Sequence, residues 1–318
     1  MTTVQVWQAL GPGIPVLAAA LVLTIVFLVL NRVSRAGIVA RGTFREIIRQ
    51  PVFILMIVAA AVLTLLNMFV PFFAFKDETK MFKDVVLSTV LVAALLLGIW
   101  SAANSISEEV EGRTAMTLLS KPIMRWQFIL GKYLGIAQAV LAAVVLLGAV
   151  TLPATYVKYG YDRKETGGGK LDMFTWAKLG EADVISFQPD RFEAAVSLIP
   201  SLSLVFLQAA VMASIAVALS TRLPMLVNLV TCFAIYVVGH LMPQLLSGGG
   251  EQPEFVAFIA KVFASVLPSL DSYDTSAAIA TGEVVPLAYL GVTAAYSLCY
   301  VAVAMLVAFI LFEDHDLA

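Results

Sequence analysis

The stretch that decides the fold is Val85–Ile106, VVLSTVLVAALLLGIWSAANSI, which contains no Asp, Glu, Lys or Arg. A membrane-spanning helix needs about 20 mostly apolar residues, because the hydrocarbon layer is about 30 Å thick and each helical residue rises about 1.5 Å. Further apolar runs flank this one along the chain, at 14–30, 52–75, 134–156, 194–219, 225–246 and 287–312. The sequence therefore predicts seven membrane-spanning helices.

The composition of the whole chain agrees with a membrane protein. Of its 318 residues, 60% are hydrophobic and 13% are charged, and the mean hydropathy is +0.93. Soluble proteins average about 45–50% apolar and about 25% charged residues, so an ordinary water-soluble enzyme is excluded. The formal net charge of -2 shows no basic excess, so we expect the lipid bilayer and no nucleic acid among the partners.

The arginines indicate how the chain is oriented. Short cytoplasmic loops of membrane proteins are enriched in Lys and Arg. If the N-terminus faces outward, the cytoplasmic segments are 31–51, 107–133, 220–224 and the tail after 312, and these hold eight of the ten arginines. We therefore expect a multi-pass protein of the cell inner (plasma) membrane, with its N-terminus outside and its C-terminus in the cytoplasm.

The first predicted span, 14–30, is not a cleavable signal peptide, because its positive charges follow the apolar run instead of preceding it. We interpret residues 1–35 as an outward N-terminus and a permanent membrane anchor. The run is short and contains Pro15, so a loosely associated segment is the alternative.

Residues 36–50 have the pattern of a helix that lies in the headgroup layer of the membrane. Arg41, Arg45 and Arg49 recur every four residues. Ala40, Phe44, Ile47 and Ile48 occupy a neighbouring arc, which would face the acyl chains. The alternative is a basic linker that only fixes the topology.

Two long outer loops are expected, at about 157–192 and 247–286. The first is polar and contains Gly167–Gly169, so we predict an exposed and partly mobile excursion, and we assign it no chemistry. The second includes the apolar stretch Phe255–Leu267, which is too short to span the membrane. That stretch could form a re-entrant helix that acts as a gate, or it could simply cap the bundle.

Catalytic motifs are missing from the sequence. His240 and His315 lie in no zinc-binding pattern, and Cys232 and Cys299 fall in apolar runs typical of packing residues. Gly131-Lys132 is not part of a phosphate-binding loop, because Trp126 and Tyr133 replace the Gly and the Ser or Thr that such a loop requires. We therefore expect no catalytic residue, no metal site and no cofactor on this chain.

The most informative polar segment is SEEVEGRTAMTLLSKPIMRWQFILGK, residues 107–132. Ser107 is a candidate N-cap, three glutamates follow in what would be the first helical turn, and Pro122 would end the helix. The pattern predicts a short cytoplasmic helix at about 107–121. Such a helix could transmit force from a soluble partner, or its charges could only solvate a loop and fix the topology.

This segment resembles the signature segment of type-2 ABC transporter permeases, the membrane subunits of exporters whose ATPase is a separate chain. The resemblance rests on Glu109, Glu111, Thr114, Leu118-Leu119, Lys121-Pro122, Arg125 and Gly131-Lys132, and the ending Phe312–Asp316 is also similar. It implies an all-α polytopic bundle, with a six-helix permease core at 36–318 and one extra N-terminal transmembrane helix.

The resemblance also implies the partners. The segment 107–121 would be the coupling helix that docks on the ATPase, which would hold ATP-Mg, and a second permease subunit would complete the transporter. The contact residues would be Glu108, Glu109, Glu111, Arg113, Thr114, Lys121, Pro122 and Arg125. The alternatives are a membrane scaffold driven by the same kind of ATPase, or an ion-coupled carrier.

A stripe of small residues, Gly131, Gly135, Ala139 and Ala143, recurs every four positions along one predicted span. Small residues let two membrane helices approach closely. The stripe could pack within the chain or form the seam of a dimer.

Overall fold

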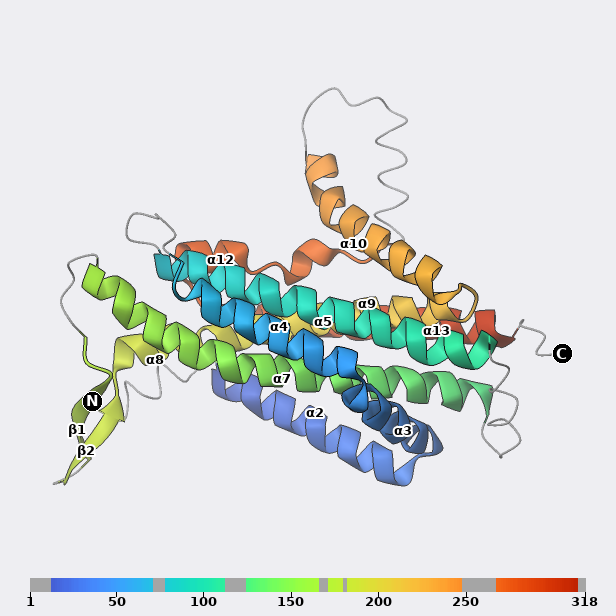
Figure 1. The fold of residues 1–318 in the computed structure, drawn as a ribbon, viewed down its shortest axis with the longest axis horizontal. Helices are drawn as coiled ribbons and strands as arrows, with labels where there is room; N and C mark the ends of the chain where they lie inside the picture. Colours follow the sequence, from blue (N-terminus) through green and yellow to red (C-terminus); the bar gives the residue numbers. More distant parts are fainter. Residues whose placement is uncertain are drawn as a thin grey trace.

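A computed structural model describes residues 13–70, 78–111, 124–165, 171–179, 182–247 and 267–313. Over these ranges the chain forms an elongated helical bundle with one small β-hairpin at its end (Figure 1). In chain order the elements are α2 (Gly13–Val33), α3 (Arg35–Arg49), α4 (Pro51–Asn67), α5 (Glu78–Glu111), α7 (Arg125–Glu165), β1 (Phe174–Leu179), β2 (Ala182–Phe187), α8 (Pro189–Val196), α9 (Leu198–Ser220), α10 (Met225–Ser247), η1 (Leu270–Tyr273), α12 (Ser276–Thr281) and α13 (Leu287–Glu313).

Each apolar run predicted to span the membrane is mainly helical over its described residues. In the run 52–75, α4 ends at Asn67, and residues 71–75 are outside the described part of the chain. Within the described ranges, five segments are long and apolar enough to cross a membrane, and the α3–α4 pair, bent by 60°, raises the number to six. The apolar part of α10, Met225–Leu241, is shorter than the other spans. The all-α multi-pass architecture is thus confirmed, whereas the count of seven spans stays a prediction.

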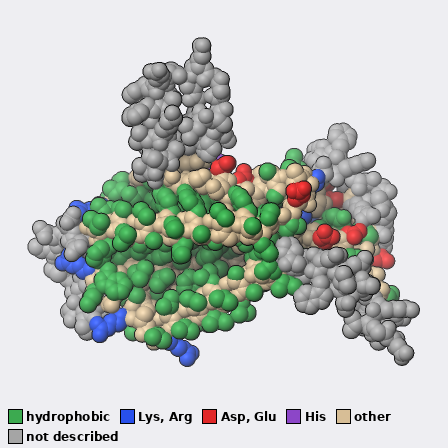
Figure 2. All heavy atoms as spheres, turned by 180° about the vertical axis from the view of Figure 1, so that it is seen from behind, with side chains coloured by type: hydrophobic (Ala, Val, Ile, Leu, Met, Phe, Trp, Pro, Cys, Tyr) green, Lys and Arg blue, Asp and Glu red, His purple; other side chains and the backbone are tan. Residues whose placement is uncertain are grey.

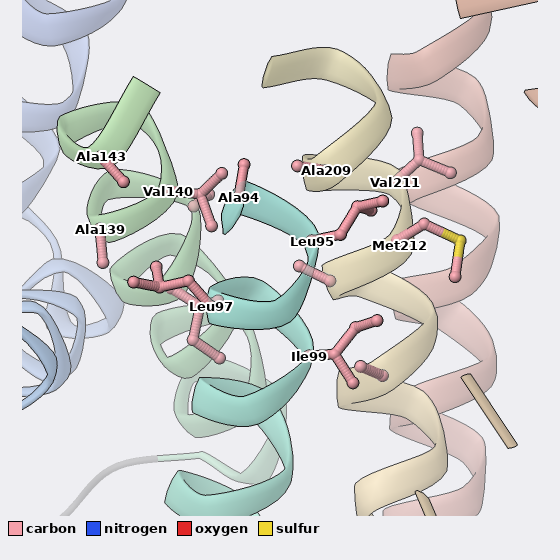
Figure 3. Close-up of a cluster of buried hydrophobic side chains, with 14 of the residues drawn as sticks. Ala94, Leu95, Leu97, Ile99, Ala139, Val140, Ala143, Ala209, Val211 and Met212 are labelled. Carbon is pink, nitrogen blue, oxygen red and sulfur yellow. The ribbon is translucent and has the colours of Figure 1, made fainter. Parts of the chain in front are cut away.

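The core of the bundle lies where α5, α7 and α9 meet. Ala94 on α5, Val140 on α7 and Ala209 on α9 lie at one level of the bundle, and all three are completely buried (Figure 3). Ala139 and Ala143, the alanines of the small-residue stripe, are 0% and 1% exposed in the same cluster. Lipid chains are as apolar as these side chains, so close van der Waals packing of small residues holds the helices together.

The surface divides the bundle into an apolar middle and two polar ends. Figure 2 shows hydrophobic side chains over the middle, Lys and Arg gathered mostly at one end, and Asp and Glu extending from the middle of the upper edge to the other end. The basic end is where α5 stops and α7 starts, and we call it the α5–α7 end. The acidic end carries the strands, and we call it the hairpin end. This arrangement fits a protein that spans a membrane between the two ends.

The first outer loop is more ordered than its sequence suggested. Instead of leaving the helix near residue 157, α7 continues to Glu165, and the chain then forms the antiparallel pair β1–β2. The strands contain aromatic and β-branched residues, such as Phe174, Trp176, Val184 and Ile185, that favour extended structure. The excursion is exposed at Phe174, Trp176 and Phe187, as predicted, and a helix end and a hairpin make up its described part.

Ion pairs explain why α7 extends beyond its apolar run. Lys158 is almost completely buried, and its Nζ lies 2.9 Å from Asp162 Oδ1 and 3.5 Å from Glu78 Oε2. Thr79 Oγ1 donates a 2.7 Å hydrogen bond to Asp162 Oδ2. Because Glu78 and Thr79 begin α5, this cluster fastens the outer part of α7 to α5.

Only part of the second outer loop is described. Residues 267–286 hold the short helices η1 and α12. Of the apolar stretch Phe255–Leu267, only the last residue, Leu267, is among the described residues. The proposal of a re-entrant or interfacial segment there remains a prediction.

Helix α2 is attached to the bundle by a pair of buried amides. Asn31 Nδ2 donates to Gln138 Oε1 at 2.8 Å, and Gln138 Nε2 donates to Asn31 Oδ1 at 3.2 Å. Both side chains are buried, although most of α2 is exposed on the outside of the bundle. The reciprocal bonds give each of the two amides one donated and one accepted hydrogen bond, which lowers the cost of burying them in a membrane bundle.

We expect the Asn31–Gln138 pair to stabilise the docking of α2. A double-mutant cycle with Asn31→Leu and Gln138→Leu should give a coupling between about 0.6 kcal/mol, the average for hydrogen bonds between membrane helices, and about 1.7 kcal/mol, the largest such value. The measurement is unfolding in mixed micelles. Thr24→Val is the matched control, because the Thr24 hydroxyl bonds within its own helix, to Ala20 O at 2.8 Å. A coupling indistinguishable from zero would contradict the role of the pair.

Candidate functional site

The predicted coupling segment is framed by two spanning helices that meet at one end of the bundle. Helix α5 stops at Glu111 and α7 starts at Arg125, and both sites lie at the α5–α7 end (Figure 1). Arg125, the first residue of α7, is exposed. The predicted contact residues Arg113, Thr114, Lys121 and Pro122 lie outside the described residues.

The acidic residues of the segment do not begin a helix. Glu108, Glu109 and Glu111 form the last turns of α5, which continues without a break from the membrane span. The prediction that Ser107 caps a new helix was therefore wrong. Glutamate is a good helix former, so a helix can continue through these residues. The next residue, Gly112, has a low helix propensity. Residues 112–121 of the predicted coupling helix are not among those described.

This correction changes what the acidic turn can do. The 34 residues of α5 form one rod of about 51 Å at 1.5 Å per residue. The rod leads from the hairpin end through the core to the three glutamates. A force applied to these glutamates would therefore act directly on a spanning helix.

A buried lysine joins three helices next to this turn. Lys132 on α7 donates from Nζ to Ser105 Oγ at 2.8 Å and to Ser105 O at 3.2 Å, both on α5. The same Nζ lies 3.9 Å from Glu46 Oε2 on α3 and 5.8 Å from the centre of the Phe128 ring. The Lys132 side chain is 4% exposed, and that of Glu46 is 45% exposed. The ammonium group thus ties α3, α5 and α7 together within two turns of the start of α7.

The sequence singled out Lys132 only as part of the Gly131-Lys132 dipeptide. Its partner Ser105 is 27 positions away along the chain, and no periodic pattern links them. One signal was present: a lysine inside an otherwise apolar helix needs polar partners, because a buried charge is costly without them. That signal predicts a partner but not its identity.

The turn between α9 and α10 closes the same end of the bundle. Ser220 Oγ donates to Ala102 O on α5 at 3.1 Å, and Asn228 Nδ2 donates to Ser220 Oγ at 2.6 Å. Arg222 Nε donates to Leu311 O on α13 at 2.9 Å. These bonds connect α5, α9, α10 and α13 beside the end of α5.

The glycines of the small-residue stripe pack against α3. A Cβ on Gly131 would lie 2.6 Å from the carbonyl oxygen of Ala36. A Cβ on Gly135 would lie 2.7 Å from the carbonyl oxygen of Ala40 and from Thr43 Cβ. Both distances are shorter than a carbon atom tolerates, so only glycine allows the observed approach of α3 to α7. This half of the stripe is used within the chain.

Helix α3 therefore differs from the predicted interfacial helix in one respect. Its apolar arc, expected to face acyl chains, packs against protein: Ala40 and Ile47 are 0% and 1% exposed. Arg45 and Arg49 are exposed as expected, whereas Arg41 donates a hydrogen bond to the backbone carbonyl of Asn31 at the end of α2. Close contact with the glycines of α7 explains why the arc faces inward.

The comparison with protein families decides the class of the protein. The family model described as ABC-2 family transporter protein matches residues 38–317. The chain belongs to this family. It is a membrane permease component of an ABC system, and its apolar helices agree with a position in a membrane. The ABC-2 match begins inside α3, so α2 lies before the matched residues. No curated protein matches the chain.

Proposed function

We propose that the chain is the transmembrane permease subunit of an ATP-driven ABC export system. A separate ATPase holds ATP-Mg and docks on the segment between Glu108 and Arg125. The observation that carries the proposal is that α5 ends at Glu111 and α7 begins at Arg125 at the same end of a bundle of the ABC-2 family.

The charges support a cytoplasmic position for this end. Lys and Arg gather at the α5–α7 end in Figure 2, and cytoplasmic loops carry such an excess. The protein would lie in the cell inner (plasma) membrane, and the ATPase would bind this end from the cytoplasm. The hairpin end and the N-terminus would face outward.

The contacts at the α5–α7 end give a physical route for coupling. Closure of two ATPase subunits would displace the end of α5, and Lys132 would pass the displacement to α3 and α7 through Ser105 and Glu46. Such a shift of rigid helices can switch a permease between two states. A second permease subunit, identical or related, would form the other side of the path.

The test is transport in proteoliposomes that contain the chain and its ATPase. A fluorescent lysophospholipid is a suitable probe, because the spans are apolar with scattered amides such as Gln138 and Gln208. We expect movement with ATP, and none with a non-hydrolysable analogue or with an ATPase that lacks its phosphate-loop lysine.

Two other outcomes would contradict the proposal. ATP hydrolysis without movement of any probe, but with release of a bound protein, would indicate a scaffold. Movement driven by an ion gradient in the absence of ATP would indicate a carrier.

A further inference from the structure

A small pocket lies at the hairpin end, far from the predicted coupling segment. Its volume is about 150 Å³, and it is formed by α5, α7, α9 and the α12 turn. Pockets for drug-sized ligands measure about 300–1,000 Å³, so this one has room only for a small group. The polar residues that line it include Lys80, Lys83, Tyr159, Ser197, Ser201 and Glu283.

The charges in the pocket are of both signs. Lys83 donates from Nζ to Ser197 Oγ at 2.9 Å, and Lys80 donates from Nζ to Ala280 O at 2.9 Å, so both ammonium groups are held at the pocket wall. Glu283 is exposed, and it is the one acidic side chain among the described residues that line the pocket. A ligand with one anionic and one cationic group matches this set.

The depth of the pocket matches the headgroup layer of a membrane. Lys83 lies five residues after Glu78, the start of α5, which corresponds to about 7.5 Å of helix. The apolar run begins two residues later, at Val85. Each headgroup layer of a bilayer is about 5–8 Å thick, so Lys83 would reach the depth of lipid phosphates.

We propose that this pocket binds a phosphoethanolamine group, as carried by phosphatidylethanolamine. Lys80, Lys83 and the hydroxyl of Tyr159 donate to the phosphate oxygens, and Glu283 accepts from the primary ammonium. The Ser197 hydroxyl donates to Ala194 O at 2.9 Å and accepts from Lys83, so it positions the lysine. Phosphate bound by lysine forms charge-assisted hydrogen bonds, which are stronger than neutral ones. The site is independent of the coupling segment and of the proposed transport cycle.

Native mass spectrometry of the full chain in detergent tests the proposal, with phosphatidylethanolamine, phosphatidylglycerol and diacylglycerol as probes. We expect retention of phosphatidylethanolamine above both others. Lys83→Met should weaken its retention at least tenfold, and Lys83→Arg should preserve it. Lys178→Met, on β1 at the same end, is the matched control and should have no effect.

Glu283→Gln is a second test of the proposal. Glu283 is exposed, so we expect this replacement to leave the fold intact. It should remove the preference for phosphatidylethanolamine over phosphatidylglycerol without reducing the retention of phosphatidylglycerol. Competition by soluble phosphoethanolamine would support recognition of the headgroup alone, and failure to compete would support the lipid as the source. The proposal would be overturned if the parent chain retained diacylglycerol as well as phosphatidylethanolamine. It would also be overturned if Lys83→Met and Glu283→Gln retained phosphatidylethanolamine as well as the parent chain does.

Discussion

Replacement of Gly135 by alanine is expected to destabilise the protein by about 1–3 kcal/mol, the usual cost of overpacking a core. The added Cβ would lie 2.7 Å from the backbone oxygen of Ala40, which cannot rotate away as a side chain could. Helices α3 and α7 must then separate. The measurement is the free energy of unfolding in mixed micelles, or the melting temperature in detergent.

Gly42→Ala is the matched control, because it lies on α3 and its Cβ would meet no atom within 4 Å. Alanine favours a helix by about 1 kcal/mol over glycine, so this variant should be as stable as the parent or slightly more stable. Equal stability of the Gly135 variant and its control would show that the approach of α3 to α7 is not tight.

The spans could be predicted from the sequence because hydropathy alone determines them. A helix in lipid must satisfy its own backbone hydrogen bonds, so the apolar run Val85–Ile106 had no other structure available. The same reasoning located the runs that became α7, α9, α10 and α13. Their ends were less predictable, because helices extend past the apolar run wherever polar contacts such as Lys158–Asp162 support them.

The polar contacts at the α5–α7 end could not be predicted, because they join residues distant in the chain. The periodicity of Gly131 and Gly135 showed that some helix approaches closely, but not that this helix is α3. The basic and apolar faces of 36–50 were recognised, yet the same pattern suits a helix on lipid and a helix on protein. The choice depended on the glycines of α7, which offered α3 a groove.

The acidic residues of the coupling segment were assigned to the wrong end of a helix. Acidic residues after Ser107 resembled the start of a helix, where the dipole favours negative charge. They lie instead at the end of α5, where negative charge is unfavourable to the helix. Residues that weaken their own helix need another reason to be present, and binding of a basic partner surface is one.

The double charge reversal Glu109→Lys with Arg113→Glu is expected to reduce association with the ATPase at least tenfold, which corresponds to about 1.4 kcal/mol. Both residues belong to the segment proposed to dock on the ATPase, and reversal turns attraction at a complementary interface into repulsion. The measurement is the amount of ATPase that copurifies with the tagged chain, together with ATP hydrolysis per complex.

The position of Glu109 in α5 makes this test sharper than the sequence alone allowed. Lysine near the C-terminus of a helix is favoured by the dipole by about 0.3–1 kcal/mol, so Glu109→Lys should strengthen the end of α5. Glu109→Lys alone should therefore be compared with the double reversal, because association lost in this single variant cannot be attributed to unwinding of the helix. The reversal Asp172→Lys with Lys178→Glu, at the hairpin end, is the control and should leave the complex intact. Normal ATPase stoichiometry in the Glu109 and Arg113 variant would remove the coupling role from this segment, and with it the proposed mechanism of export.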